Sequence, residues 1–67
     1  MTIFAERLKE LRKKNKVTQA ELTLATFITQ STISKYERGE IEPSASVLIK
    51  IADFFDVSID YLCGRDK

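Results

Sequence analysis

Five polar side chains recur at helical spacing near the middle of the sequence, and no acidic residue lies among them on that face. They are Gln30, Ser31, Ser34, Lys35 and Arg38. At 100° per residue they span about 140° of a helix surface. Their amide, hydroxyl and cationic groups can bond base edges and phosphates, because Gln pairs with adenine, Lys with guanine and Ser with either. An ordinary solvated face would mix in acidic residues, so the pattern favours nucleic-acid recognition.

Catalysis and metal binding find little support in the same sequence. It contains no His, the commonest general base, and its single Cys63 has no partner for a disulfide or a zinc site. We therefore expect a protein that is not an enzyme and that uses no metal, cofactor or small-molecule ligand. Cys63 is interpreted as a small core or interface residue.

The charges are distributed unevenly, although the net charge is only +1. Residues 1–16 carry six basic and two acidic side chains, whereas residues 17–43 carry two and four. Any attraction to phosphate must then come from a polarised surface. The cluster of Lys13, Lys14 and Lys16 is either part of that surface or simply the solvated side of a helix.

The 67 residues correspond to one small domain, residues 1–67, with 43% hydrophobic residues, two Gly and one Pro. This composition suits a compact helical fold. No apolar run approaches the roughly 20 residues that span a bilayer, and the first residues do not look like a signal peptide. We expect a cytoplasmic protein with no membrane partner.

Apolar periodicity and capping signals predict the first two helices. An apolar stripe predicts a helix over residues 3–15, and its members are Phe4, Leu8 and Leu11. Thr18 and Glu21 have the spacing of a capping box, which predicts that a second helix starts there, with Leu22 in the core.

Further hydroxyl residues and glycines predict the limits of the third and fourth helices. Thr29 can cap a helix that runs through Arg38, and Gly39 suits the left-handed residue after it. Pro43 then breaks the pattern and Ser44 can cap a fourth helix over residues 45–55. Its apolar arc contains Val47, Leu48, Ile51, Ala52, Phe54 and Phe55, and leaves Ile49 outside.

A short fifth helix is predicted at the end of the chain. Ser58 can cap it and Gly64 can close it. Ile59, Leu62 and Cys63 are then able to point inward.

Several segments carry a family resemblance: TQAEL, ITQSTISKYERGE, PS, KIADFFDVS and IDYL. Together they resemble the phage repressor and Cro type of helix-turn-helix transcriptional regulators over almost the whole chain. The resemblance implies an all-α fold, a compact five-helix bundle like the lambda-repressor DNA-binding domain, with the helix-turn-helix at helices 2 and 3. It also implies a sequence-specific regulator, a repressor, whose homodimer binds double-stranded DNA with the third helix in the major groove of a palindromic operator.

The resemblance assigns roles to particular residues. Gln19 opens the second helix, where free N–H groups and the helix dipole favour a phosphate, although it could be plain first-turn sequence. Thr29 matches a phosphate-contacting hydroxyl. The positions that face the major groove are Gln30, Ser31, Ser34 and Lys35. Arg38 and Lys14 could contact the flanking backbone. The two serines are the weaker assignments, because Ser is common on helix surfaces.

Arg12 and Glu37 have a different expected role. The resemblance places them where the first and third helices meet, so an ion pair there could orient the third helix. Such pairing would leave Arg12 only partly free to contact phosphate.

Phe27 and Thr23 depart from the family pattern, which favours Gly and Ala at these positions. Three interpretations of Phe27 compete: a strained turn of ordinary geometry, an altered turn that buries the ring, or loss of the motif. The first implies a left-handed Phe, at a cost of about 1–2 kcal/mol. Thr23 has two more heavy atoms than the Ala that the family favours, and they lie where the two helices of the motif cross closely.

The surface of the chain that contacts other proteins is less well defined. Tyr61, Leu62 and Cys63 are candidate dimer contacts, with Ile49, although Leu62 fits the core equally well. An alternative function is a protein-interaction module, such as an antitoxin or antirepressor partner, that uses Leu24 and Ile49. A third interpretation is the N-terminal DNA-binding domain of a longer repressor.

Overall fold

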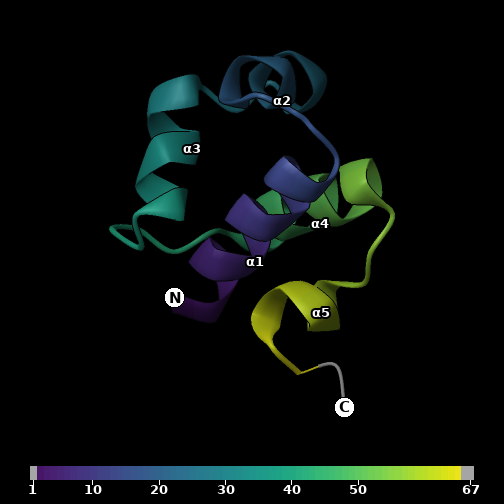
Figure 1. Ribbon diagram of the computed structural model, residues 1–67. Coiled ribbons are helices and arrows are strands. Elements are labelled where there is room, and N and C mark those ends of the chain that lie inside the picture. The colour runs from purple at the N-terminus through teal and green to yellow at the C-terminus, as the bar shows by residue number, and fades with distance from the viewer. Residues whose placement is uncertain (1, 66–67) are drawn as a thin grey trace.

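The structure is a computed structural model that describes residues 2–65, and this range forms five α-helices without any strand (Figure 1). The helices are α1 (Thr2–Lys14), α2 (Gln19–Thr26), α3 (Gln30–Glu37), α4 (Ala45–Phe55) and α5 (Ile59–Cys63). The predicted all-α fold is confirmed. Within this range no helix is long and apolar enough to cross a membrane.

A hydroxyl side chain begins each helix from α2 to α5, as predicted. Thr18, Thr29, Ser44 and Ser58 each accept a hydrogen bond from the backbone N–H three residues later. At Thr18 the Glu21 carboxylate also accepts from the Thr18 N–H at 2.9 Å, which completes the capping box. These local signals fix the first residue of each helix, because they satisfy N–H groups that the helix itself leaves unpaired.

Left-handed residues end the helices or follow them. Gly39 and Gly64 have φ of 73° and 76°, as their positions predicted. Gly64 has a second reason to be glycine, since a Cβ there would lie 2.7 Å from Cγ2 of Ile3. The end of α5 thus approaches α1 closely.

The core draws its largest fully buried side chains from every helix. They are Phe4, Leu8, Leu22, Ile33, Ile51 and Leu62. Burying each contributes roughly 1.5–3 kcal/mol relative to exposure. The rings of Phe4 and Tyr36 add an edge-to-face contact between α1 and α3, with centroids 5.7 Å apart. α1 therefore positions α3 on one side and α5 on the other (Figure 1).

Two side chains predicted to point inward are exposed instead. Phe54 lies at the edge of the apolar arc of α4 and remains 40% exposed, and Ile59, the first residue of α5, is also 40% exposed. Periodicity places a residue on a helix face but does not show whether another element covers that face. Leu62 is fully buried, so its side chain offers no surface to a second subunit. Tyr61 and Cys63 are half-buried.

Candidate nucleic-acid interface

A turn of three residues, Phe27 to Thr29, joins α2 to α3. Ile28 anchors it in the core at 8% exposure. The Thr26 hydroxyl donates to the Leu22 carbonyl at 2.7 Å and accepts from the Ile28 N–H at 3.3 Å. The turn is thereby fixed by one apolar contact and two hydrogen bonds, and α3 leaves it in a defined direction.

Phe27 has the left-handed backbone that the motif requires, with φ of 61° and ψ of 19°. Its N–H donates to the Thr23 carbonyl at 2.8 Å, and its ring is 88% exposed. The interpretation as a strained turn of ordinary geometry is confirmed, and the interpretation with a buried ring is wrong. Because the ring is exposed, burial against residues 2–65 does not offset the cost of the left-handed backbone at Phe27.

Thr23 is the second departure from the family pattern, and the structure shows its consequence. Its hydroxyl oxygen is buried and meets no hydrogen-bond partner among residues 2–65. A buried unsatisfied polar group costs about 1–3 kcal/mol. Both unusual residues of this motif therefore lower stability.

The outer face of α3 displays the predicted polar side chains. Gln30, Ser31 and Lys35 are exposed, whereas Ile33 and Tyr36 are buried on the opposite side. Arg38 is exposed just after the helix, where its guanidinium pairs with Glu40. This contact raises the pKa of Arg38 and lowers that of Glu40. Arg38 is the one residue of this set whose charge is already paired.

Ser34 and Gln19 contact each other, although each was expected to contact DNA separately. The Ser34 hydroxyl donates to Oε1 of Gln19 at 2.8 Å, and Nε2 of Gln19 donates to Oε1 of Glu37 at 3.1 Å. Both ends of the Gln19 amide are thus held against α3. No local pattern could have revealed this pair, because 15 residues separate its members and only the crossing of α2 and α3 brings them together.

Arg12 and Glu37 form the ion pair expected between the first and third helices. Arg12 donates from Nε at 2.6 Å and from Nη2 at 3.0 Å, and its Nη1 donates to the Val17 carbonyl at 3.0 Å. The side chains are only 16% and 6% exposed, so the pair lies largely out of solvent. This bidentate contact fixes α3 relative to α1 and occupies the Arg12 guanidinium.

The environment of Glu37 favours its charged form on balance. Desolvation raises its pKa, but hydrogen bonds from Arg12 and Gln19 and the charges of Arg12 and Lys9 outweigh that effect. The pKa of Glu37 therefore lies below its ordinary value, while its hydrogen bond raises the pKa of Arg12. Both side chains stay charged at neutral pH.

The remaining predicted contacts lie on exposed surface. Lys14 is the last residue of α1, and Lys13 and Lys16 beside it are exposed as well. The Thr29 hydroxyl is exposed, but it already caps α3 and donates to the Thr32 hydroxyl at 2.8 Å. A phosphate at this position would have to compete for its proton with Thr32.

Comparisons with known proteins give a consistent result. The helix-turn-helix family model matches residues 8–62. The cryptic phage CTXphi transcriptional repressor RstR of Vibrio cholerae is 45% identical over 60 residues, which are 90% of this chain and 54% of RstR. The HTH-type transcriptional regulator ImmR of Bacillus subtilis is 39% identical over 64 residues, 96% of this chain and 50% of ImmR.

Among solved structures, a repressor bound to DNA is similar to this chain over nearly the full length of both chains. It is the P22 c2 repressor protein in complex with a synthetic operator, with 35% sequence identity and a TM-score of 0.87. The superposition covers 94% of this chain and 96% of that one. The chain spans about half the length of RstR and ImmR, by contrast.

Proposed function

Because this chain belongs to the helix-turn-helix family of transcriptional regulators, we propose that it binds specific sites on double-stranded DNA and represses transcription. The observation that carries the proposal is the outer face of α3, where Gln30, Ser31 and Lys35 are exposed with no carboxylate among them. The major groove admits a helix and presents a distinct hydrogen-bonding pattern for each base pair. A helix with amide, hydroxyl and ammonium groups on one face suits that pattern.

The side chains of this face divide into two roles. Gln30 and Lys35 read bases, with adenine and guanine as their natural partners, and Ser31 adds a hydrogen bond to either. Ser34 is better described as a positioning residue, because its hydroxyl is used to hold the Gln19 amide. Gln19 lies at the start of α2, where the helix dipole attracts a phosphate, and the second N–H of its Nε2, which the bond to Glu37 does not use, is the group that would donate to it.

Phosphate contacts on either side of the groove complete the proposed interface. Lys14 approaches the backbone from the end of α1, and Thr29 does so from the start of α3. Arg38 can join them if a phosphate displaces Glu40, since an exposed ion pair is held weakly. Such contacts supply affinity without sequence information.

We also propose that two copies bind one two-fold symmetric operator. The P22 c2 repressor, whose fold this chain shares, was solved in complex with a synthetic operator, and RstR is named a repressor. Two recognition helices related by a two-fold axis reach successive major grooves about 34–36 Å apart. Repression follows if such a site overlaps a promoter.

Selection of bound duplexes from a random DNA pool at near-physiological salt tests the proposal. We expect enrichment of a site with two inverted half-sites. A folded protein that enriches no sequence, or that binds all duplexes alike, would contradict specific readout and favour the alternative function in protein interaction.

A further inference from the structure

The carboxylate of Glu40 lies beside two cationic residues at the C-terminal end of the proposed DNA interface. Nε of Arg38 donates a hydrogen bond to Oε2 of Glu40 at 2.5 Å, and Nη2 donates to Oε1 at 3.4 Å. The hydrogen bond from Arg38, together with the charges of Arg38 and Lys35, holds the pKa of Glu40 below its ordinary value. Glu40 is thus near both the cation assigned to a phosphate and the cation assigned to a base.

The backbone at the end of α3 fixes the position of Glu40. The Gly39 N–H donates to the Tyr36 carbonyl at 3.1 Å, and the Glu40 N–H donates to the Lys35 carbonyl at 2.9 Å. With Gly39 left-handed at φ of 73°, these two bonds form the Schellman motif that commonly ends a helix. Glu40 is therefore held against the last turn of α3, so its contact with Arg38 belongs to the helix end and not to a free loop.

A carboxylate and a DNA phosphate bind a guanidinium in the same way. Each presents two oxygens to a pair of N–H groups on one edge of the planar group. Glu40 occupies such an edge of Arg38, formed by Nε and Nη2. The side chains of Arg38 and Glu40 are 56% and 49% exposed, so a phosphate can reach the same donors. The carboxylate and a phosphate of the DNA backbone are therefore alternative partners for this edge of Arg38.

The negative charge of Glu40 still opposes DNA binding once a phosphate has displaced it from Arg38. The displaced carboxylate stays close to the last turn of α3, because the backbone of Glu40 is bonded there. It therefore lies near the phosphate that Arg38 would contact, and the two negative charges repel each other. Both effects are independent of base sequence, since every base pair is flanked by the same phosphates.

We propose that Glu40 is an intramolecular competitor that takes the place of a DNA phosphate on Arg38 and so weakens binding to DNA of every sequence. This inference rests on the proposed function, because it concerns the same interface. Non-specific binding comes almost wholly from phosphate contacts, whereas an operator adds base contacts. An equal penalty on both lowers the occupancy of non-specific DNA, and the base contacts of Gln30 and Lys35 then decide which sites are filled.

Glu40→Gln tests the proposal, because it removes the negative charge and keeps the size of the side chain. Fluorescence anisotropy measures its affinity for a random-sequence duplex and for the selected operator over a series of salt concentrations. We expect the affinity to rise about fivefold on both duplexes. The plot of log affinity against log salt should become steeper by roughly one unit, because Arg38 is then free to neutralise one more phosphate.

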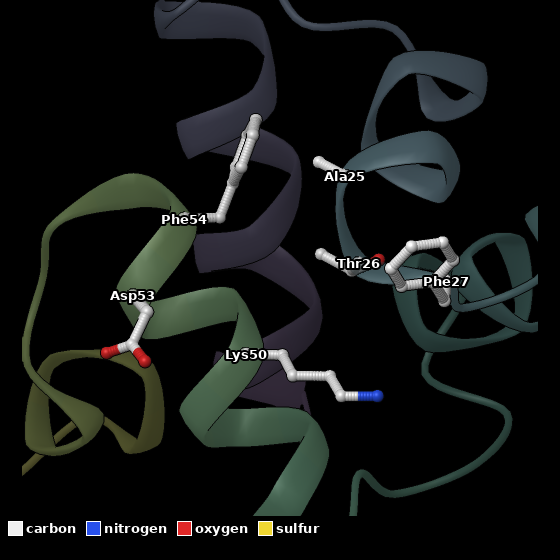
Figure 2. Close-up of a pocket in the computed structure, with 6 residues that line it drawn as sticks. All are labelled: Ala25, Thr26, Phe27, Lys50, Asp53 and Phe54. Atoms are coloured by element: carbon white, nitrogen blue, oxygen red, sulfur yellow. The ribbon is translucent and has the colours of Figure 1, made fainter.

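Asp53→Asn is the matched control for the loss of one negative charge. Asp53 lies on α4, where it lines a hollow of about 370 Å³ together with Phe27, Lys50 and Phe54, and no residue of α3 lines this hollow (Figure 2). Neither Lys50 nor Asp53 forms an ion pair with another residue of the range 2–65, so Asp53→Asn frees no cation. We expect its DNA affinity to stay within about twofold of the parent chain, because salt screens an exposed charge outside the interface. Melting curves verify that each variant is folded.

A double-mutant cycle with Arg38→Gln shows whether the competition takes place at Arg38. In the Arg38→Gln background, the guanidinium for which the carboxylate and the phosphate compete is absent. Glu40→Gln should then raise the affinity by less than about twofold. This coupling distinguishes competition for one side chain from a general effect of charge near DNA.

Several results would overturn the proposal. Weaker binding of Glu40→Gln would show that Glu40 orients Arg38 toward a phosphate instead of competing with it. An unchanged affinity, or an equal gain in the Arg38→Gln background or in Asp53→Asn, would also contradict it. The random duplex keeps this test separate from the proposed function, because a chain without sequence preference still shows whether Glu40→Gln binds more tightly. Failure of both parent and variant to bind any duplex at low salt would contradict both proposals.

Discussion

At the scale of single residues, the proposed interface separates side chains that read bases from those that hold other side chains. Gln30 and Lys35 are exposed. Ser34 and Gln19 have the same chemistry but are already bonded to each other. Residue type therefore identifies candidate DNA-binding side chains, and their hydrogen bonds within the chain decide which of them have polar groups free to bind bases.

Replacing a base-reading residue should change sequence preference. Lys35→Ala and Gln30→Ala each remove the groups that discriminate one base, so we expect discrimination at one position per half-site to fall by about 1–3 kcal/mol. Titration of the selected operator and its single-base variants measures this. Uniform weakening on every DNA would argue against base readout by α3.

Replacing a phosphate-binding residue should have the opposite signature. Lys14→Ala removes one positive charge near the DNA backbone, so binding should weaken equally for all sequences. The plot of log affinity against log salt should become shallower by roughly one unit for each phosphate that the protein no longer neutralises. An unchanged salt slope would remove Lys14 from the interface.

At the scale of elements, capping residues and the contacts of α3 explain the geometry of the motif. The hydroxyls of Thr18, Thr29, Ser44 and Ser58 begin their helices where the sequence predicted, because capping depends only on neighbours a few residues away. Exposure of Phe54 could not be predicted in the same way. It depends on which elements pack beside α4.

The turn between α2 and α3 gives a prediction of stability. Phe27→Gly removes the left-handed strain of a non-glycine residue, and the ring that it deletes is exposed, so we expect stabilisation of about 1 kcal/mol. In a domain of this size that corresponds to a rise in Tm of about 4–8 °C. Thermal unfolding measures this change, and a marked fall in Tm would contradict the strained-turn interpretation.

The ion pair between α1 and α3 predicts a pH dependence. The pKa of Glu37 is lower in the folded chain than its ordinary value of 4.5. Its contribution to stability is therefore present above that value and is lost as pH falls through the lower, folded pKa. Glu37→Gln should be less stable at neutral pH, because Arg12 loses its charged partner, and should lose less stability on acidification.

Denaturant unfolding at neutral pH and at about pH 3 measures both effects. Glu10→Gln is a suitable control, because Glu10 is an exposed residue of α1. Equal acid sensitivity of the Glu37 variant and the parent chain would show that this pair does not govern acid stability.

At the scale of the whole molecule, two surfaces differ in their chemistry. The outer face of α3 is polar and free of carboxylates, whereas the face around Phe27 and Phe54 is apolar with a balanced pair of charges. The all-α fold, its helix limits to within one residue and the polar face of α3 could be predicted from local patterns and family resemblance. The bond between Ser34 and Gln19 and the surface around Phe54 could not, because both depend on helices that meet only in the folded chain.

In the proposed function, α3 recognises its site through the major groove. Its most direct test is the affinity for the selected operator in which one purine at a time is replaced by a deaza analogue lacking the N7 acceptor. We predict marked weakening at one or two purines of each half-site, and little effect when inosine removes the minor-groove amino group of guanine. Unchanged binding to every deaza-substituted operator, with sensitivity to inosine instead, would contradict the claim.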